Sequence, residues 1–215
     1  MTRYESVAVS PETASMERAV QWAVDVLEDG GVLAHPTDTV YGIGGAALPE
    51  VDLRVAALKG RVLDAAPLIR IAADMETLEA AFPELLWPVE ARRLALGFWP
   101  GSLTLVLGDG AGRGTAVRVE GHPVIRTVLK AWGAPIGSTS LNLAGESAAV
   151  TSRQSRECLD RMPDVEAPVL FLDAGTLPGP PPSTLVSFLG TVPEVLREGA
   201  VPADAIQSCL KGAGS

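Results

Sequence analysis

Small polar residues and a few basic residues carry the chemistry that this sequence could perform. Hydroxyl and amide side chains follow or precede short apolar runs at Thr37, Thr39, Ser138, Ser140, Asn142, Ser183 and Thr184. Positive charge is available from Lys59, Arg61, Arg118 and Arg197. Hydroxyl and backbone N–H groups bind phosphate oxygens, and a guanidinium group binds a carboxylate through two parallel hydrogen bonds. Together these residues predict a pocket for anionic small molecules.

Several common catalytic motifs are missing from the sequence. None of the three lysines, Lys59, Lys130 and Lys211, is followed by Ser or Thr, which excludes a Walker A phosphate-binding loop. Residues 42–47 match G-x-G-x-x-A, but a polar stretch precedes them and Pro49 follows, so we do not expect a dinucleotide site. No G-x-S-x-G nucleophile motif occurs. Two histidines and two scattered cysteines do not make a usual zinc site, and we predict no protein-bound metal.

The composition predicts one globular domain. The chain has 215 residues, of which 47% are hydrophobic and 20% are charged. A net charge of −9 and only 5% aromatic residues argue against strong nucleic-acid binding, because such binding neutralises phosphates and stacks bases. We find neither a signal peptide nor an apolar run of about 18 residues. We therefore expect a cytoplasmic protein with no membrane segment, whose Cys158 and Cys209 are free thiols.

Apolar periodicity indicates the elements that must position the polar residues. Apolar residues between 16 and 27 recur at helical spacing, and the two glycines at 30–31 end that helix. Further helices are expected at 53–58, 124–132, 151–161 and 203–210, with broken helices over 74–98. Strands are expected at 32–35, 68–72, 103–107, 115–119, 169–172, 185–188 and 194–196. The polar run 138–142 is expected to follow a strand near Ile136. This mixture without strict βαβ alternation predicts an α/β domain on a twisted mixed sheet flanked by helices.

Five other residues have expectations that a structure can test. Glu120 is expected to be a solvated loop acid, and His122 to cap a helix rather than to transfer protons. Trp99 and Trp132 are expected in the core rather than as surfaces for base stacking. For Asp38 two interpretations stay open, namely orienting an amine or a lysine and capping a turn.

The order and spacing of several segments resemble the threonylcarbamoyl-AMP synthase family, which has a YrdC-like domain. The matching segments are 35–44 (HPTDTVYGIG), 59–61 (KGR), 98–107 (FWPGSLTLVL), 116–119 (AVRV), 138–145 (STSLNLAG), 183–184 (ST) and 196–199 (LREG). They run in family order between about residue 15 and residue 207. The resemblance implies a single YrdC-like domain over residues 1–215, with residues 1–9 and 211–215 as loose ends.

The resemblance also implies a reaction. L-Threonine, bicarbonate and ATP, the last with Mg²⁺, would give threonylcarbamoyl-AMP and pyrophosphate, which makes the enzyme a nucleotidyltransferase. A separate transferase complex would then move the threonylcarbamoyl group to adenosine 37 of certain tRNAs. Direct tRNA binding by this chain is expected to be weak or absent, in keeping with its acidic charge.

Roles for individual residues follow from the same resemblance. Threonine would be bound by Thr37, Arg118, Ser138 and Ser183. The catalytic residues facing the phosphates would be Lys59 and Arg61, which also bind ATP together with Ser140, Asn142 and Arg197. The family's usual proline, alanine and proline are replaced here by Val62, Leu141 and Glu198. The alternative interpretation is therefore a diverged YrdC-like paralogue that binds nucleotide or RNA without this activity.

Overall fold

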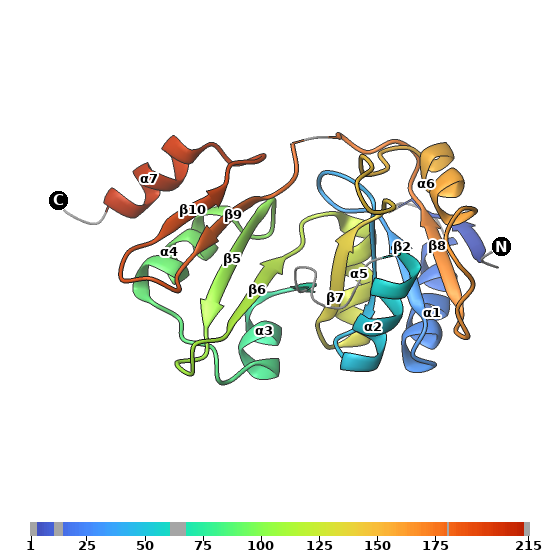
Figure 1. The fold of residues 1–215 in the computed structure, drawn as a ribbon, viewed down its shortest axis with the longest axis horizontal. Coiled ribbons are helices and arrows are strands. Elements are labelled where there is room, and N and C mark those ends of the chain that lie inside the picture. Colours follow the sequence, from blue (N-terminus) through green and yellow to red (C-terminus); the bar gives the residue numbers. More distant parts are fainter. Residues whose placement is uncertain (1–3, 11–14, 61–67, 180, 213–215) are drawn as a thin grey trace.

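A computed structural model describes residues 4–10, 15–60, 68–179 and 181–212 of the chain. The helices are α1 (Ser15–Glu28), α2 (Pro49–Leu58), α3 (Met75–Ala81), α4 (Val89–Phe98), α5 (Pro123–Trp132), α6 (Ser152–Leu159) and α7 (Ala203–Lys211). The strands are β1 (Glu5–Ala8), β2 (Val32–His35), β3 (Gly42–Ala46), β4 (Ile69–Ala72), β5 (Leu103–Gly108), β6 (Gly114–Val119), β7 (Ile136–Ser140), β8 (Val169–Asp173), β9 (Thr184–Ser187) and β10 (Glu194–Arg197). Figure 1 shows the helices and strands along an elongated molecule.

All of these strands belong to one sheet with the order β1-β8-β2-β3-β7-β4-β6-β5-β9-β10. The pairs β1–β8, β2–β8, β4–β6 and β5–β9 are parallel, and the remaining neighbours are antiparallel. The structure thus confirms the predicted α/β class and the mixed sheet. The Gly-rich segment between β5 and β6 forms a hairpin.

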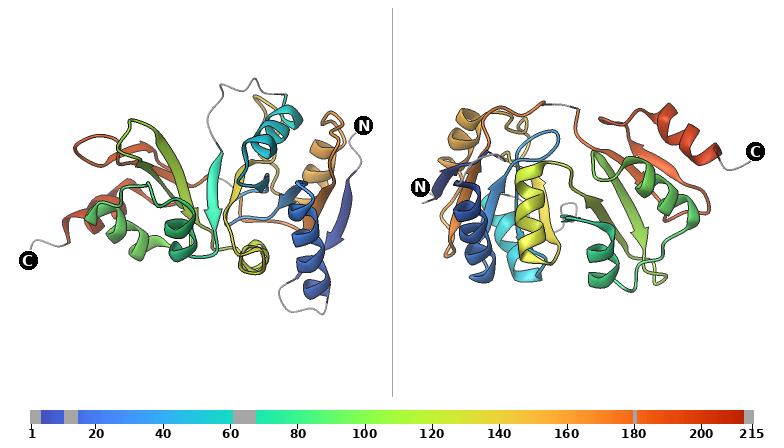
Figure 2. Two further views of the ribbon diagram at one scale, coloured as in Figure 1. Left: turned by 90° about the horizontal axis from the view of Figure 1, so that it is seen from below. Right: turned by 180° about the vertical axis from the view of Figure 1, so that it is seen from behind.

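The sheet has two halves that differ in how helices cover them (Figure 2). In the double-covered half (β1, β8, β2, β3 and β7), α1 and α5 pack on one face and α2 and α6 on the other, giving two apolar cores. In the single-covered half (β4, β6, β5, β9 and β10), α3, α4 and α7 build one core against one face. Along β6, Val117 and Val119 belong to that core, so Arg118 between them points to the opposite face.

Local sequence signals account for much of this arrangement. The predicted helix at 16–27 is α1, and the segment 74–98 is broken between α3 and α4 as expected. His122 caps α5 as expected, because its ring nitrogen accepts a hydrogen bond from the Val124 amide. Thr151 and Gln154 form a reciprocal capping box at the start of α6. Trp99 and Trp132 pack against apolar cores, which confirms that expectation.

Three segments differ from the expectation. The N-terminal segment 1–9 is expected to be loose, yet Glu5–Ala8 forms β1 and pairs in parallel with β8. This edge strand is mostly exposed, so it lacks the apolar alternation that would indicate a strand. The polar run is expected to follow a strand, but Ser138 and Ser140 lie within β7 and pair with β3. At the other end, Lys211 belongs to α7, and residues 213–215 lie outside the described part of the chain.

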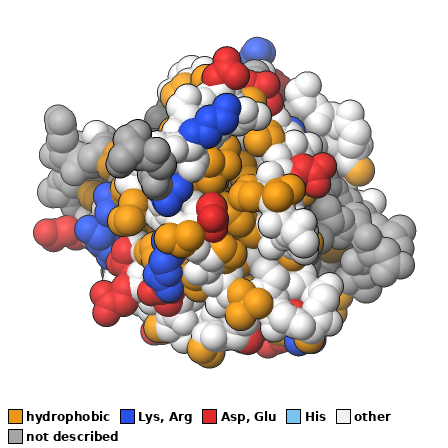
Figure 3. Space-filling view, turned by 90° about the vertical axis from the view of Figure 1, so that its left-hand side faces the viewer, with side chains coloured by type: hydrophobic (Ala, Val, Ile, Leu, Met, Phe, Trp, Pro, Cys, Tyr) orange, Lys and Arg blue, Asp and Glu red, His pale blue; other side chains and the backbone are white. Residues whose placement is uncertain are grey.

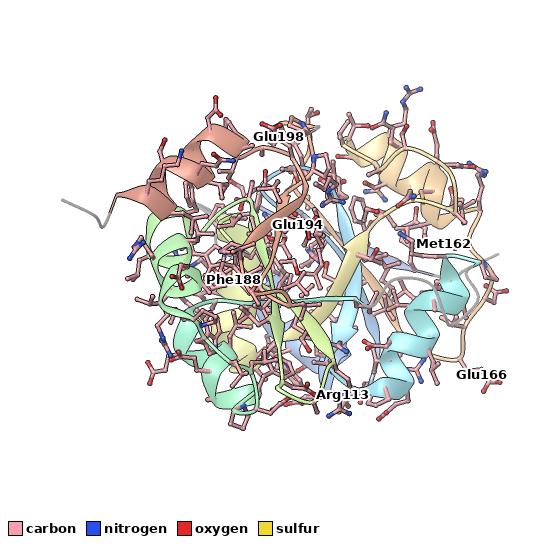
Figure 4. All side chains as sticks on the ribbon, turned by 60° about the vertical axis from the view of Figure 1, so that its left-hand side comes forward. Arg113, Met162, Glu166, Phe188, Glu194 and Glu198 are labelled. Atoms are coloured by element: carbon pink, nitrogen blue, oxygen red, sulfur yellow. The ribbon has the colours of Figure 1, made fainter. Side chains whose placement is uncertain are left out.

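The end of the molecule that contains β9, β10 and α7 carries both apolar and charged side chains on its surface (Figure 3). Leu189, Val192 and Leu196 are among the exposed apolar residues of this region. In Figure 4, Phe188 and Glu194 lie near the middle of the view, and Glu166 lies at the right-hand edge. None of the helices within the described ranges has the length and apolar character needed to cross a membrane.

Candidate functional site

Lys59 directly follows α2 and is buried with its ammonium group beside the end of β7. Its Nζ donates to Asn142 Oδ1 at 2.9 Å, to the Ser140 carbonyl and, at 3.5 Å, to Thr139 Oγ1. The Ser140 hydroxyl also donates to Asn142 Oδ1, at 2.6 Å. Three residues predicted to bind ATP, Lys59, Ser140 and Asn142, are therefore brought into direct contact.

The turn after β7 is held by the side chains of Leu141 and Asn142. The Asn142 amide nitrogen donates to the carbonyls of Leu143 and Glu146, each at 2.9 Å. Leu141, which replaces the family's usual alanine, is fully buried in the core shared by α2 and α6. Its extra bulk therefore points into the core. Arg61 and Val62 lie outside the described residues.

Arg118 is buried on the face of β6 that the helices of the single-covered half leave free. Its Nε donates to the Gly101 carbonyl at 2.8 Å, and its Nη2 donates to Asp38 Oδ2 at 2.9 Å and to Glu120 Oε1 at 3.1 Å. Asp38 also accepts a hydrogen bond from the Gly121 amide at 3.1 Å. The Asp38 carboxylate therefore holds an arginine and a distant loop amide, and its orientation of a bound amine stays a prediction.

The expectation for Glu120 is wrong. Its side chain is fully buried, because the segment around Asp38 folds over it. Besides Arg118, Oε1 accepts hydrogen bonds from the amides of Asp38 at 3.1 Å and Gly121 at 3.2 Å. Oε2 has no hydrogen-bond partner within the described part of the chain. Burial, reinforced by the Asp38 charge and opposed by Arg118, raises the pKa of Glu120 to about 7.

His35 orients Ser138, although the sequence alone gives His35 no role. His35 Nδ1 is 3.2 Å from the Pro36 carbonyl and so donates to it, which leaves Nε2 to accept from the Ser138 hydroxyl at 3.1 Å. Burial lowers the pKa of His35 to about 4, so the neutral ring is retained near neutral pH. Gly42 permits this contact, because a Cβ there would lie 2.7 Å from His35 Cε1.

Thr37 stabilises the turn that carries Asp38. Its hydroxyl donates to the Val40 carbonyl at 2.6 Å and accepts from the Thr39 amide at 3.3 Å. This is the local hydrogen bonding expected of threonine in a turn. Direct contact between Thr37 and a threonine substrate stays a prediction.

Ser183 and Arg197 are in contact, although the resemblance assigns them to different ligands. Arg197 Nη2 donates to the Ser183 carbonyl at 2.8 Å and lies 3.4 Å from its hydroxyl, which also bonds Thr104 Oγ1 at 2.9 Å. Glu198, which replaces a family proline, accepts from the Ala203 amide at 2.8 Å. Its carboxylate therefore caps the start of α7 and does not pair with Arg197.

Short chain segments connect these groups. Residues 35–38 join the His35–Ser138 pair to the Arg118 cluster, and β7 joins Ser138 to the Lys59 cluster. Gly101 accepts from Arg118, and the next residue, Ser102, accepts from the Thr184 amide at 3.0 Å. The predicted residues Thr37, Lys59, Arg118, Ser138, Ser140, Asn142, Ser183 and Arg197 are therefore linked through neighbouring contacts. Their assignment to particular ligands stays a prediction.

Comparison with known proteins gives a consistent family. A family model named for Sua5, YciO and YrdC and described as "Telomere recombination" matches residues 25–199. A protein of Mycobacterium tuberculosis H37Rv is 34% identical, covering 93% of this chain and 92% of its own length. The threonylcarbamoyl-AMP synthase of Stenotrophomonas maltophilia is 36% identical, covering 67% of this chain and 80% of its own.

Solved structures agree with this comparison. The structure of Pyrococcus abyssi Sua5 complexed with L-threonine has a TM-score of 0.81 and 28% identity, covering 98% of this chain. The chain spans 61% of the length of that protein. Escherichia coli YciO has a TM-score of 0.78 at 22% identity and is similar in fold over 96% of this chain. The chain therefore belongs to the Sua5/YciO/YrdC family.

Proposed function

We propose that this chain is a threonylcarbamoyl-AMP synthase that uses L-threonine, bicarbonate and ATP. The observation that carries the proposal is a pair of buried basic side chains, Lys59 bonded to Asn142 and Arg118 bonded to Asp38, joined through β7 and residues 35–38. Curated relatives over most of the chain bear this name, and a similar protein has been solved with L-threonine. In this proposal the product serves as donor for tRNA modification by a separate transferase complex.

The reaction needs positioned reactants more than a protein nucleophile. The threonine amine is carboxylated to a carbamate, whose oxygen attacks the α-phosphorus of ATP and displaces pyrophosphate. Arg118 would hold the threonine carboxylate, since its Nη1 makes no hydrogen bond to the described residues. Lys59 would face the phosphates with Arg61, and Ser140, Asn142 and Arg197 would hold the nucleotide. Proximity and charge neutralisation then supply the catalysis.

Mg²⁺ enters the proposal only as the counter-ion of ATP. Within the described ranges, no group of three histidine, cysteine, aspartate or glutamate side chains is placed to hold a metal ion. Mg²⁺ bound to nucleotide characteristically keeps several waters and takes few protein ligands. We therefore assign it no protein ligand and route no step through it.

The alternative, a paralogue without this activity, gains no support from the described residues. Leu141 and Glu198, two of the departures from the family pattern, point into the core and toward α7. Neither disturbs the hydrogen bonds of Lys59 or Arg118.

Pyrophosphate release with ATP, bicarbonate and L-threonine, each omitted in turn, tests the proposal. Release should require all three substrates. Lys59→Ala should weaken the use of ATP, and Arg118→Lys should mainly weaken the use of threonine. Each variant loses a charge-assisted bond of about 1.5–3 kcal/mol, roughly 10- to 150-fold.

Arg113→Lys is the matched control, since Arg113 pairs with Asp109 on the exposed β5–β6 turn. It should behave as wild type. If wild type releases no pyrophosphate with the complete mixture, the paralogue interpretation replaces the proposal.

A further inference from the structure

Arg118 already donates hydrogen bonds to two protein carboxylates in the absence of a substrate. Asp38 Oδ2 and Glu120 Oε1 both accept from Nη2, and the Gly101 carbonyl accepts from Nε. Nη1 has no bond to a described residue and remains for a ligand. The three protein contacts fix the plane of the guanidinium group, so they also fix the direction in which Nη1 can donate.

The two carboxylates are bound unequally. Asp38 keeps about a fifth of its side-chain surface exposed, whereas that of Glu120 is fully covered. Glu120 Oε1 is well supplied with donors, but Oε2 has none within the described part of the chain. A buried carboxylate oxygen without a donor destabilises the ionised form of the acid.

We propose that Glu120 is a positioning residue that orients Arg118 for the carboxylate of the amino-acid substrate and takes up one proton when that carboxylate binds. The proposal rests on the proposed function, because it requires threonine to bind at Arg118. With both acids ionised, the cluster of Asp38, Arg118 and Glu120 has a net charge of −1. A substrate carboxylate would bring it to −2, and protonation of Glu120 Oε2 from solvent restores −1.

The groups that face Glu120 come from three parts of the fold. Arg118 precedes it on β6, Asp38 reaches it from the segment after β2, and His122 stands at the start of α5. Burial lowers the pKa of His122, so its ring is neutral near neutral pH and does not offset the acids. His35 is likewise held neutral by burial. Of the groups named here, Arg118 is therefore the cation that stabilises ionised Glu120. A substrate carboxylate bound to Arg118 would weaken this stabilisation.

The direction in which threonine affinity changes with pH follows from the pKa of Glu120 in the free protein. Burial raises the pKa of Glu120 to about 7, so both of its forms are populated near neutral pH. A bound carboxylate raises this pKa further, because it adds negative charge beside the same guanidinium. Threonine affinity is therefore highest when Glu120 is protonated and falls as pH rises above about 7. One linked proton limits the fall to about tenfold per pH unit.

Calorimetric titration with L-threonine alone tests this coupling. The binding heat of wild type, measured at pH 7.5 in phosphate, HEPES and Tris, should vary with the ionisation enthalpy of the buffer. The dependence should correspond to net proton uptake of up to about one proton per threonine. Glu120→Gln cannot take up this proton but keeps an oxygen for the backbone amides. It should show no net uptake, and its affinity should stay within about twofold between pH 6 and pH 8.

Glu166→Gln is the matched control, because it removes one acid from an exposed site in the loop before β8, at the right-hand edge of the molecule in Figure 4. It should take up as many protons as wild type.

Threonine binding by wild type without proton uptake would overturn the inference and leave the proposed function standing. Absence of threonine binding would instead overturn both. Equal uptake by wild type and Glu120→Gln would also reject Glu120 as the proton acceptor. Since proton uptake by wild type is measured on the unaltered protein, the inference stays testable even if Glu120→Gln is unstable.

Discussion

The two halves of the sheet use their faces differently. In the double-covered half, β2 and most of β8 are buried at every position, because helices pack on both faces. In the single-covered half, β5 and β6 alternate, with leucine and valine toward the helices and Thr104 and Arg118 on the other face. The comparison teaches that the face left without helices is where polar and charged side chains can be gathered for binding. His35 at the end of β2, Ser138 on β7 and Lys59 after α2 are buried polar residues that the double-covered half contributes near its own edge.

The largest expected effect is on the free energy of unfolding, when a phenylalanine is truncated in each half in turn. Phe171 on β8 is fully buried and packs edge-on against Tyr41 with ring centroids 5.5 Å apart. Phe171→Ala should lower the free energy of unfolding by about 3–5 kcal/mol, because it leaves a cavity in the core between the sheet and the helices α2 and α6. Phe188, just after β9, is half-buried, so Phe188→Ala should cost clearly less. Urea denaturation measures both, and equal losses would contradict the distinction between the halves.

The next effect concerns His35, a buried polar residue of the double-covered half. The pKa of His35 is lowered by burial from 6.5 to about 4. Between these values the unfolded chain binds a proton that the folded chain does not, so stability falls as pH drops from 6.5 toward 4. The full loss is roughly 3 kcal/mol.

A pH series of thermal melts on wild type and His35→Gln measures this loss. The variant should flatten the dependence on pH over this window, since glutamine does not titrate. His122→Gln is the control, and it should flatten the dependence less, because His122 is only half-buried. An unchanged slope in His35→Gln would show that His35 does not bind the proton in question.

The smallest effect is expected on the face without helices. Thr104→Val keeps the shape of the side chain and removes its bond to Ser183 Oγ. Because Ser183 Oγ still lies 3.4 Å from Arg197 Nη2, the free energy of unfolding should fall by only about 0.5–1.5 kcal/mol. Urea denaturation of Thr104→Val and Phe188→Ala under the same conditions shows which variant loses more free energy of unfolding. A loss as large as that of Phe171→Ala would mean that this face is packed like a core.

The sequence is sufficient where the structure depends on local patterns. The apolar stripe of 16–27 and the proline before Val124 predict α1 and α5, since helix formation there needs only neighbouring residues. Lys59, Ser140 and Asn142 are predicted as one group, and the structure brings them into contact. That grouping comes from a family resemblance, because their separation along the chain carries no local signal.

The sequence is insufficient where burial depends on distant segments. Glu120 looks like a loop acid beside a glycine, and it is buried because residues some 80 positions earlier fold over it. His35 lies at the end of an apolar strand, and its partner Ser138 lies on another strand. β1 is recognised only by its pairing with β8, because an exposed edge strand needs no apolar pattern. In each case the deciding contact is tertiary, which periodicity does not reveal.

The chain passes through each half of the sheet twice. β1 to β3 with α1 and α2 build the double-covered half, β4 to β6 with α3 and α4 enter the other half, α5 to β8 return, and β9 to α7 complete the second half. Each half is thus encoded by two separated stretches of sequence, and each stretch forms strands beside the other stretch of its own half. A recombination event that exchanges one continuous segment cannot transplant either half intact. A single exchanged segment would separate Lys59 from Asn142 or Arg118 from Asp38, because each pair joins two different stretches of the chain.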